Sequence, residues 1–107
     1  IVTFSEVANK QSDFLFEKFN INIKNFAVLQ LEFEPTNTER KRIKKTDDET
    51  YVLAYRTWRI SYKINNDIKN VNILNICSAY TEFELKDIEN DKYNDKKIHL
   101  EYINQIF

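Results

Sequence analysis

Residues 50–85 read TYVLAYRTWRISYKINNDIKNVNILNICSAYTEFEL, and this stretch decides the fold class. Two apolar runs lie on either side of a polar hinge at residues 65–70, which is the pattern of two strands joined by a turn. In the first run, every second residue is apolar except Arg56, and these residues would share one face of a strand: Val52, Ala54, Trp58, Ile60, Tyr62 and Ile64. In the second run, the apolar residues that would share one face are Val71, Ile73, Cys77, Ala79, Phe83 and Leu85. We therefore predict two long antiparallel strands with one covered face and one wetter face.

The chain before this stretch also alternates between apolar and polar residues. Residues 14–23 and 27–33 both show a two-residue period, and the second run stops at Pro35. Two further strands are therefore expected between residues 14 and 34. Residues 36–49 are polar and form a long connection, while residues 1–12 receive no element, although Ser5 is a candidate cap for a short turn.

The end of the chain has a different period. Ile98, Tyr102 and Ile106 recur every four residues, which predicts an amphipathic helix beginning near Asn94 or Asp95. Because its apolar face reaches the last residue, we expect further chain or another subunit to cover it. The expected fold is α+β, with a four-stranded antiparallel sheet of long strands followed by a C-terminal helix. Residues 1–107 are expected to form a single domain.

Composition argues against several classes of function. The formal net charge of −1 makes a nucleic-acid partner unlikely, because proteins that bind phosphate backbones usually carry a basic excess. The chain has no glycine, which excludes the glycine-rich phosphate and dinucleotide loops and leaves asparagine to occupy the turns. A single cysteine indicates a reducing compartment, here the cytoplasm, and no apolar run is long enough to span a membrane. We expect no cofactor and no metal.

No catalytic residue is predicted. His99 is the only histidine, and we expect it at the surface or at the edge of the core. Cys77 is expected to be a small buried apolar residue. The basic run at residues 40–45 is followed at once by acidic residues, and we interpret it as a solvated loop whose charges compensate.

One constellation points to RNA chemistry. On neighbouring strands, the basic groups of Arg56, Arg59 and Lys63, together with Tyr80, would position an RNA phosphate and its 2′-hydroxyl. The segment at residues 53–64 resembles the central hairpin of RelE/ParE toxins, in which a basic turn leads into an Arg-Ile-x-Tyr-x-Ile strand. The resemblance implies a ribosome-dependent mRNA-cleaving toxin. Two family features differ: strands are predicted where the family has a helical hairpin, and residues 78–81 read SAYT where it often has a His-Arg pair.

The predicted order of elements resembles a second family. Residues 14–21, 29–35, 51–64 and 76–85 are similar in order to the four strands of SecB-type export chaperones, and TEFEL at residues 81–85 matches the Phe and the aliphatic residue of their Gly-x-Phe-x-Ile/Leu ending. This resemblance implies a cytoplasmic chaperone, for protein export or associated with a toxin–antitoxin pair. It would assemble as a dimer or tetramer and hold extended, unfolded polypeptide.

The chaperone hypothesis assigns the binding surface to aromatic side chains. Trp58, Tyr62 and Phe83 are the predicted groove residues, because aromatic rings supply contact area at low entropy cost. We take the SecB-like chaperone as the leading hypothesis and the RelE/ParE-type toxin as the alternative. An interaction protein of phage or mobile-element type is the third possibility.

Overall fold

The computed structural model describes residues 1–39, 42–47 and 49–107. Its strands are β1 (Val2–Phe4), β2 (Ile43–Lys45), β3 (Thr50–Tyr55), β4 (Trp58–Asn65) and β5 (Asn70–Ser78). Its helices are α1 (Glu6–Phe19), α2 (Ile23–Leu31), α3 (Glu82–Lys86) and α4 (Lys96–Ile103). The α+β class is therefore confirmed. The basic run at residues 40–45 lies partly outside the described residues, and its last three residues form β2.

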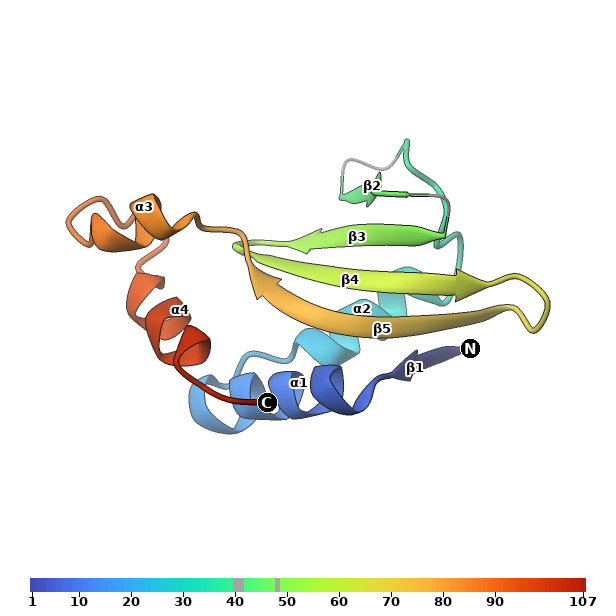
Figure 1. Ribbon diagram of the computed structural model, residues 1–107, viewed down its shortest axis with the longest axis horizontal. Coiled ribbons are helices and arrows are strands. Elements are labelled where there is room, and N and C mark those ends of the chain that lie inside the picture. Colours follow the sequence, from blue (N-terminus) through green and yellow to red (C-terminus); the bar gives the residue numbers. More distant parts are fainter. Residues whose placement is uncertain (40–41, 48) are drawn as a thin grey trace.

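The sheet has five strands in the order β1-β5-β4-β3-β2. β1 is parallel to β5, and the other neighbours are antiparallel. Figure 1 shows α1 and α2 on one side of the sheet, while α3 and α4 lie beyond one end of it. The predicted four-stranded antiparallel sheet is not confirmed, because the chain begins with an edge strand parallel to β5 and its next residues form helices.

Residues 14–19 and 23–31 lie in the helices α1 and α2, where two strands were predicted. Ser5 begins α1 by accepting a hydrogen bond from the Ala8 N–H, and Asn20 ends it with a left-handed backbone, φ 57°. Asn22 then caps α2 by accepting from the Asn25 N–H. These caps separate two helices that the two-residue alternation had concealed.

The buried positions of α1 and α2 follow the helical period. In α1 they are Ala8, Ser12 and Leu15, and in α2 they are Ile23, Ala27 and Leu31. Leu29 and Phe33, which completed the apparent strand pattern, are exposed by 62% and 72%. Single apolar residues on a surface are common, and here they imitated a strand.

The first predicted long strand is a tight hairpin. Arg56 and Thr57 form a two-residue turn between β3 and β4, and Arg56 has φ 52°. Tyr55 pairs with Trp58 and Leu53 pairs with Ile60, so the buried parity changes at the turn. The predicted inward positions Val52 and Ala54 therefore lie on the opposite face from the core.

The second predicted strand ends at Ser78 and contains an irregularity. Tyr62 pairs with Ile73 while Ser61 pairs with Asn75, so Leu74 is an extra residue in β5. The buried parity therefore moves from Ile73 to Ile76. Beyond the strand, Thr81 and Glu84 form a capping box that begins α3, so the TEFEL segment is helical rather than extended.

The predicted C-terminal helix is confirmed over Lys96–Ile103, but it ends before the last residue. Its buried side chains are Lys96, His99 and Tyr102. After the helix, the Phe107 ring returns to Phe14 at 5.7 Å between centroids. The end of the chain thus packs on α1, and Ile106 is fully exposed. No helix within the described ranges combines the length and apolar character that a membrane span requires.

Five described residues have a left-handed backbone: Asn20, Glu34, Arg56, Lys69 and Asn94. Two of the five are asparagine, as predicted for a glycine-free chain. The other three are charged residues, for which this conformation costs about 1–2 kcal/mol each.

Two leucines distinguish the helical fold from the strand prediction. Replacing Leu15, which is fully buried, by alanine should lower the free energy of unfolding by about 2–5 kcal/mol. Leu29→Ala, at an exposed site, should change it by less than about 0.5 kcal/mol. Urea denaturation followed by circular dichroism measures both, and equal losses would contradict this packing.

Candidate functional site

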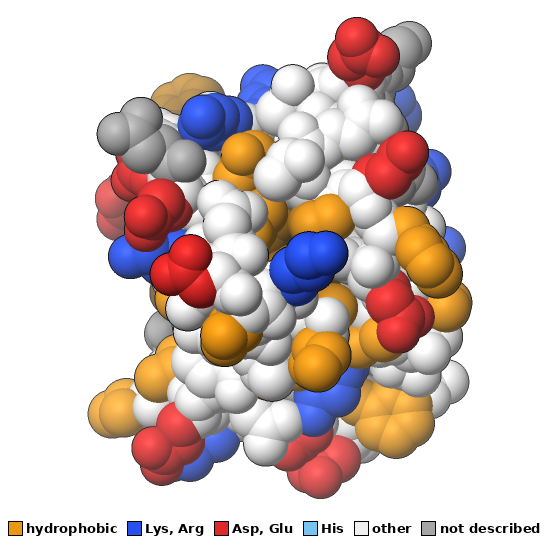
Figure 2. All heavy atoms as spheres, turned by 90° about the vertical axis from the view of Figure 1, so that its right-hand side faces the viewer, with side chains coloured by type: hydrophobic (Ala, Val, Ile, Leu, Met, Phe, Trp, Pro, Cys, Tyr) orange, Lys and Arg blue, Asp and Glu red, His pale blue; other side chains and the backbone are white. Residues whose placement is uncertain are grey.

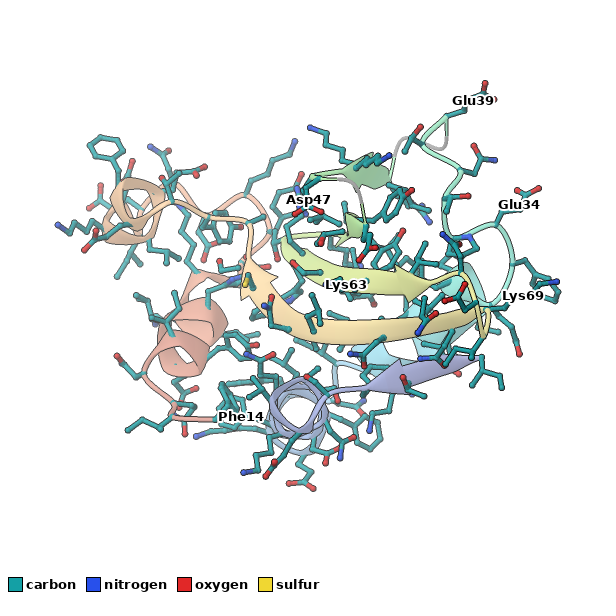
Figure 3. The ribbon with its side chains drawn as sticks, turned by 45° about the vertical axis from the view of Figure 1, so that its right-hand side comes forward. Phe14, Glu34, Glu39, Asp47, Lys63 and Lys69 are labelled. Carbon is teal, nitrogen blue, oxygen red and sulfur yellow. The ribbon has the colours of Figure 1, made fainter. Side chains whose placement is uncertain are left out.

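The helices leave one face of the sheet uncovered. This open sheet face carries the residues that alternate with the core positions: Thr50, Val52, Ala54, Arg59, Ser61, Lys63, Asn72, Asn75 and Cys77. Figure 3 shows Lys63 on this face, with α2 on the other side of the sheet. The face is polar along its central strand β4 and along β5, so it meets water and not a core.

The two basic groups of β4 have different surroundings. The Arg59 Nη1 donates hydrogen bonds to the carbonyl oxygens of Arg56, at 2.9 Å, and Trp58, at 2.8 Å, which draws the guanidinium toward the hairpin turn. The Lys63 ammonium lies 3.6 Å from the Glu49 carboxylate, and both side chains are more than half exposed. An exposed pair of this kind is weak, so Lys63 can exchange Glu49 for another anion.

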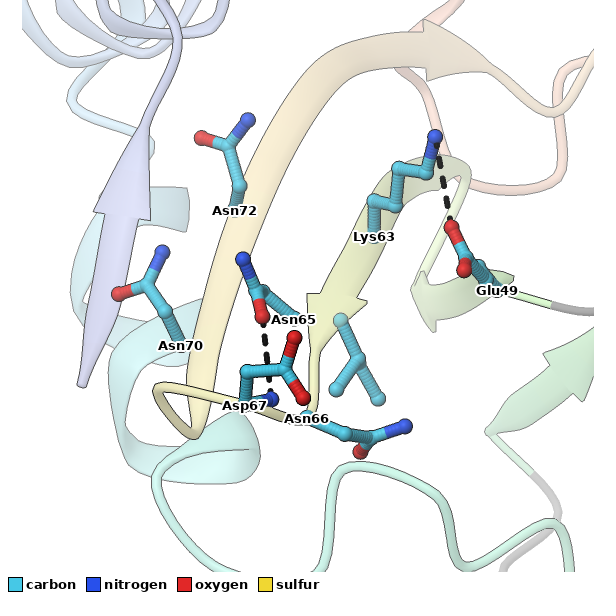
Figure 4. A pocket seen from close by; sticks show the side chains of 8 residues that line it. Glu49, Lys63, Asn65, Asn66, Asp67, Asn70 and Asn72 are labelled. Atoms are coloured by element: carbon cyan, nitrogen blue, oxygen red, sulfur yellow. Dashed lines mark hydrogen bonds and ion pairs between the residues drawn. The ribbon is translucent and has the colours of Figure 1, made fainter.

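A pocket adjoins Lys63 at the end of β4. It has a volume of 660 Å³ and is lined by Glu49, Lys63, Asp67 and four asparagines, Asn65, Asn66, Asn70 and Asn72, with Ile64. Figure 4 shows these side chains around the β4–β5 turn, with the Lys63–Glu49 pair on one wall. Asparagine amides both donate and accept hydrogen bonds, so the pocket suits a polar ligand with several hydroxyl or carbonyl groups.

The surface at this end of the molecule is mixed in charge. Figure 2 shows Lys and Arg side chains interspersed with Asp and Glu, separated by uncharged atoms. The charges of both signs at this end of the molecule therefore limit the attraction of Lys63 for an anion to a short distance.

Cys77 lies on the open sheet face and is exposed, so the prediction of a buried cysteine is wrong. The extra residue Leu74 shifts the alternation of the later residues of β5, so the Cys77 side chain points away from the core. Its Sγ donates to the Asn75 amide oxygen at 3.2 Å, and burial by its neighbours raises the pKa of the thiol. At neutral pH the group is a thiol and a poor nucleophile.

The four residues of the predicted RNA constellation are only partly brought together. Arg59 and Lys63 share the open sheet face, while Arg56 lies at the hairpin turn with its guanidinium over the Tyr55 ring, 5.6 Å from its centroid. Tyr80 lies beyond the end of β5, where its hydroxyl donates to Asp95.

The three predicted groove aromatics lie apart. Trp58 and Tyr62 are 2% and 0% exposed, and the Tyr62 hydroxyl donates to the Pro35 carbonyl oxygen. Phe83 is 82% exposed on α3. Their role in binding a polypeptide stays a prediction, and the buried position of two of them gives it no support.

A second polar cluster joins α4 to the end of the sheet, and sequence reasoning missed it. Both nitrogens of the His99 ring lie near hydroxyl groups: Nε2 is 2.9 Å from the Thr57 Oγ1 and Nδ1 is 2.5 Å from the Ser78 Oγ. Thr57 and Tyr80 donate to the two carboxylate oxygens of Asp95. One arrangement of protons satisfies the cluster: Ser78 donates to Nδ1, Nε2–H donates to Thr57, and Thr57 donates to Asp95.

His99 is completely buried, so its predicted surface position is wrong. The Trp58 ring stacks on it at 3.8 Å between centroids, and the Tyr80 ring meets it edge-on. Burial lowers the pKa of His99, and Asp95 opposes that shift only in part. The neutral ring therefore has a structural role. The only sequence signal for this cluster was the spacing of Asp95 and His99 by one helical turn.

No three His, Cys, Asp or Glu side chains of the described ranges are grouped to hold a metal ion. No protein-family model and no curated protein matches the chain. Among solved structures, the fold is similar to a chain of the toxin–antitoxin complex RelBE2 from Mycobacterium tuberculosis. The TM-score is 0.58 and the sequence identity is 22%, over 72% of this chain and 94% of that chain.

This likeness concerns the fold and corrects the leading hypothesis. The SecB-like chaperone, with its role in protein transport, is wrong, because the similar structure is a toxin–antitoxin protein and the predicted strands at residues 14–34 are helices. The alternative, a RelE/ParE-type fold, is the better supported. The homo-oligomer that accompanied the chaperone stays a prediction.

The buried histidine predicts how stability depends on pH. Because the pKa of His99 is lower in the folded protein than its ordinary value of 6.5, the unfolded chain binds the proton more readily. Stability should therefore be constant above about pH 6.5 and fall below it, by at most about 1.4 kcal/mol per pH unit for one proton. Urea midpoints between about pH 7.5 and 5.5 measure this, and the slope should be smaller in His99→Gln. An equal slope in both proteins would show that His99 is not its cause.

Proposed function

We propose that this chain is a toxin of the RelE/ParE type that binds mRNA on the open sheet face and cleaves it on the ribosome. The likeness of its fold to a chain of a toxin–antitoxin complex is the observation that carries the proposal. The hairpin sequence at residues 53–64 and the exposed cation of Lys63 on the uncovered face support it. This function requires the cytoplasm, the compartment that holds ribosomes, with residues 1–107 acting as one domain.

Each part of the open sheet face has a role in this proposal. Lys63 exchanges Glu49 for an RNA phosphate, because a phosphate offers the ammonium a stronger, charge-assisted bond than an exposed carboxylate at 3.6 Å. The N–H groups of Arg59 other than those of Nη1 contact the next phosphate or the 2′-hydroxyl. The asparagines of the adjoining pocket bind ribose hydroxyls and base edges. Because the net charge of the chain is −1, the affinity for RNA would come from these local contacts and from the ribosome.

A protein partner belongs to the same proposal. The similar solved structure is a complex of a toxin with its antitoxin. We propose that this chain likewise has a protein partner, in place of the unfolded polypeptides that the chaperone hypothesis required. A partner that contacts Lys63 would compete directly with RNA.

A second candidate function is binding without cleavage. In the described part of the chain, the open sheet face carries no group that ionises near neutral pH, because the only histidine is buried in the second cluster. Burial, followed by the bond to Asp95, raises the pKa of Tyr80, so its hydroxyl keeps its proton. Catalysis would then rely on Arg59 and Lys63 stabilising charge, or else the protein blocks translation by occupying the site.

Lys63 gives the sharpest test of this function. Lys63→Ala should reduce ribosome-dependent mRNA cleavage at least about tenfold, because a charge-assisted bond to phosphate is lost, and Lys63→Arg should retain most of it. Lys97→Ala, at an exposed lysine on α4, is the matched control and should cleave like the wild type. Cleavage sites are mapped by primer extension on translated mRNA.

Arg59→Ala should also reduce cleavage, but this variant removes two bonds to the hairpin turn as well. Its stability must therefore be measured beside its activity. Wild-type protein that inhibits translation without cutting mRNA would support the second candidate. Wild-type protein that neither cuts mRNA nor binds ribosomes would refute both.

A further inference from the structure

A cleft of 740 Å³ lies at the other end of the sheet from the asparagine-lined pocket at the β4–β5 turn. The proposed RNA site does not use this cleft. It is lined by three segments far apart in the sequence: residues 20–22 between α1 and α2, the β3–β4 turn at residues 55–58, and residues 93–95 with Ile98. We call it the hairpin-end cleft. Because its walls come from capped helix ends and a tight turn, its shape is set by the fold.

Aromatic rings and cations alternate along this cleft and beside it. The Arg56 guanidinium lies 5.6 Å from the Tyr55 centroid, and the Lys92 ammonium lies 5.4 Å from the Tyr93 centroid. On its other side, Tyr55 packs on Phe26 at 4.3 Å, and the Arg42 guanidinium lies 5.9 Å from Phe26. Within the described ranges, neither Arg42 nor Arg56 forms an ion pair with a carboxylate. These cations are therefore available to a ligand.

The polar groups of the cleft are mostly amides. Asn20, Asn22 and Asn94 line it, and the cap bond of Asn22 uses only its oxygen. The one carboxylate, Asp95, already accepts from Thr57 and Tyr80, so its oxygens are committed to the fold. Tyr93 is 59% exposed, which leaves ring surface open to a stacked partner.

A ring to stack on, flanking cations and amide groups are together the chemistry that binds an unpaired base of single-stranded nucleic acid. Base stacking on a tyrosine needs no basic excess over the whole chain, which suits a net charge of −1. Arg56 suits the same use, because the turn exposes it and its guanidinium lies beside the Tyr55 ring.

We infer that the hairpin-end cleft binds an unpaired base of single-stranded RNA, with Tyr93 as the stacking surface and Arg56 as the adjoining cation. This inference rests on the proposed function, because RNA held on the open sheet face supplies the strand. It adds a second contact point at the far end of β3 and β4, and so it extends the substrate from one cleaved bond to a longer unpaired segment.

The experiment compares two probes by fluorescence anisotropy at constant low salt: a labelled oligoadenylate, and an abasic ribose-phosphate oligomer of the same length. Tyr93→Ala should weaken binding of oligoadenylate about tenfold and leave the abasic oligomer unchanged, since stacking on one base is worth about that factor. Tyr93→Phe should bind like the wild type. Phe33→Ala, at an exposed aromatic residue that lines neither this cleft nor the pocket beside it, is the matched control and should also be unchanged.

Arg56→Gly is the second variant, because it removes the cation while glycine accepts the left-handed backbone of the turn without strain. It should be at least as stable as the wild type and should bind oligoadenylate more weakly. Wild-type binding of oligoadenylate by Tyr93→Ala and Arg56→Gly, or equal binding of both probes by the wild type, would overturn the inference. Tyr93-dependent binding of a proline-rich peptide, without RNA binding, would assign the cleft to a protein partner and would also overturn it.

The two RNA proposals fail separately. If the open sheet face is not the RNA site, Lys63→Ala will cleave normally, whatever Tyr93 does. If only the hairpin-end cleft is misassigned, Lys63→Ala will lose cleavage while Tyr93→Ala keeps its affinity for both probes.

Discussion

The register of the β3–β4 hairpin is the constraint on which the rest of this structure depends. Because the turn has two residues, Tyr51 faces Tyr62 and Leu53 faces Ile60, and all four side chains lie on the same face. The Tyr51 and Tyr62 rings stack at 5.6 Å. A shift of one residue would move this whole set to the other face, so the hairpin determines which face receives α1 and α2 and which remains open.

The same register produces both candidate sites. On the open sheet face it places Arg59 and Lys63 two pleats apart on the central strand, next to the asparagines of β5. At the turn, it directs Tyr55 and Trp58 toward the helices, where Tyr55 forms one wall of the hairpin-end cleft. The pairing of β3 with β4 therefore creates both the open sheet face and one wall of the hairpin-end cleft.

The cluster around His99 keeps the end of the sheet and α4 together. A neutral imidazole that is hydrogen-bonded at both nitrogens, stacked on Trp58 and met edge-on by Tyr80, suits a buried site because its donor and its acceptor both have partners. It also engages Thr57, Tyr80 and Asp95 in hydrogen bonds within the fold. This cluster explains why the one histidine of the chain takes no part in the proposed chemistry, which is left to Arg59 and Lys63.

The sequence by itself determined that this is an α+β protein, that antiparallel strands lie within residues 50–85, and that a helix lies near the end. Alternation over a long stretch and a four-residue period are local properties, and they reveal such elements directly. The sequence did not determine the elements at residues 14–34, where exposed Leu29, on α2, and Phe33, just after it, completed a strand-like pattern. Only the tertiary structure showed which apolar residues were covered.

The candidate sites divide in the same way. Arg59 and Lys63 were recognisable from their alternation with the core residues of one strand. The separation of Arg56 from them depended on the β3–β4 turn, and the outward position of Cys77 depended on the extra residue Leu74. The burial of His99 depended on the packing of α4 against the end of the sheet. Each such change alters the face of every later side chain, so a site assembled across several strands is decided by tertiary pairing and not by local spacing.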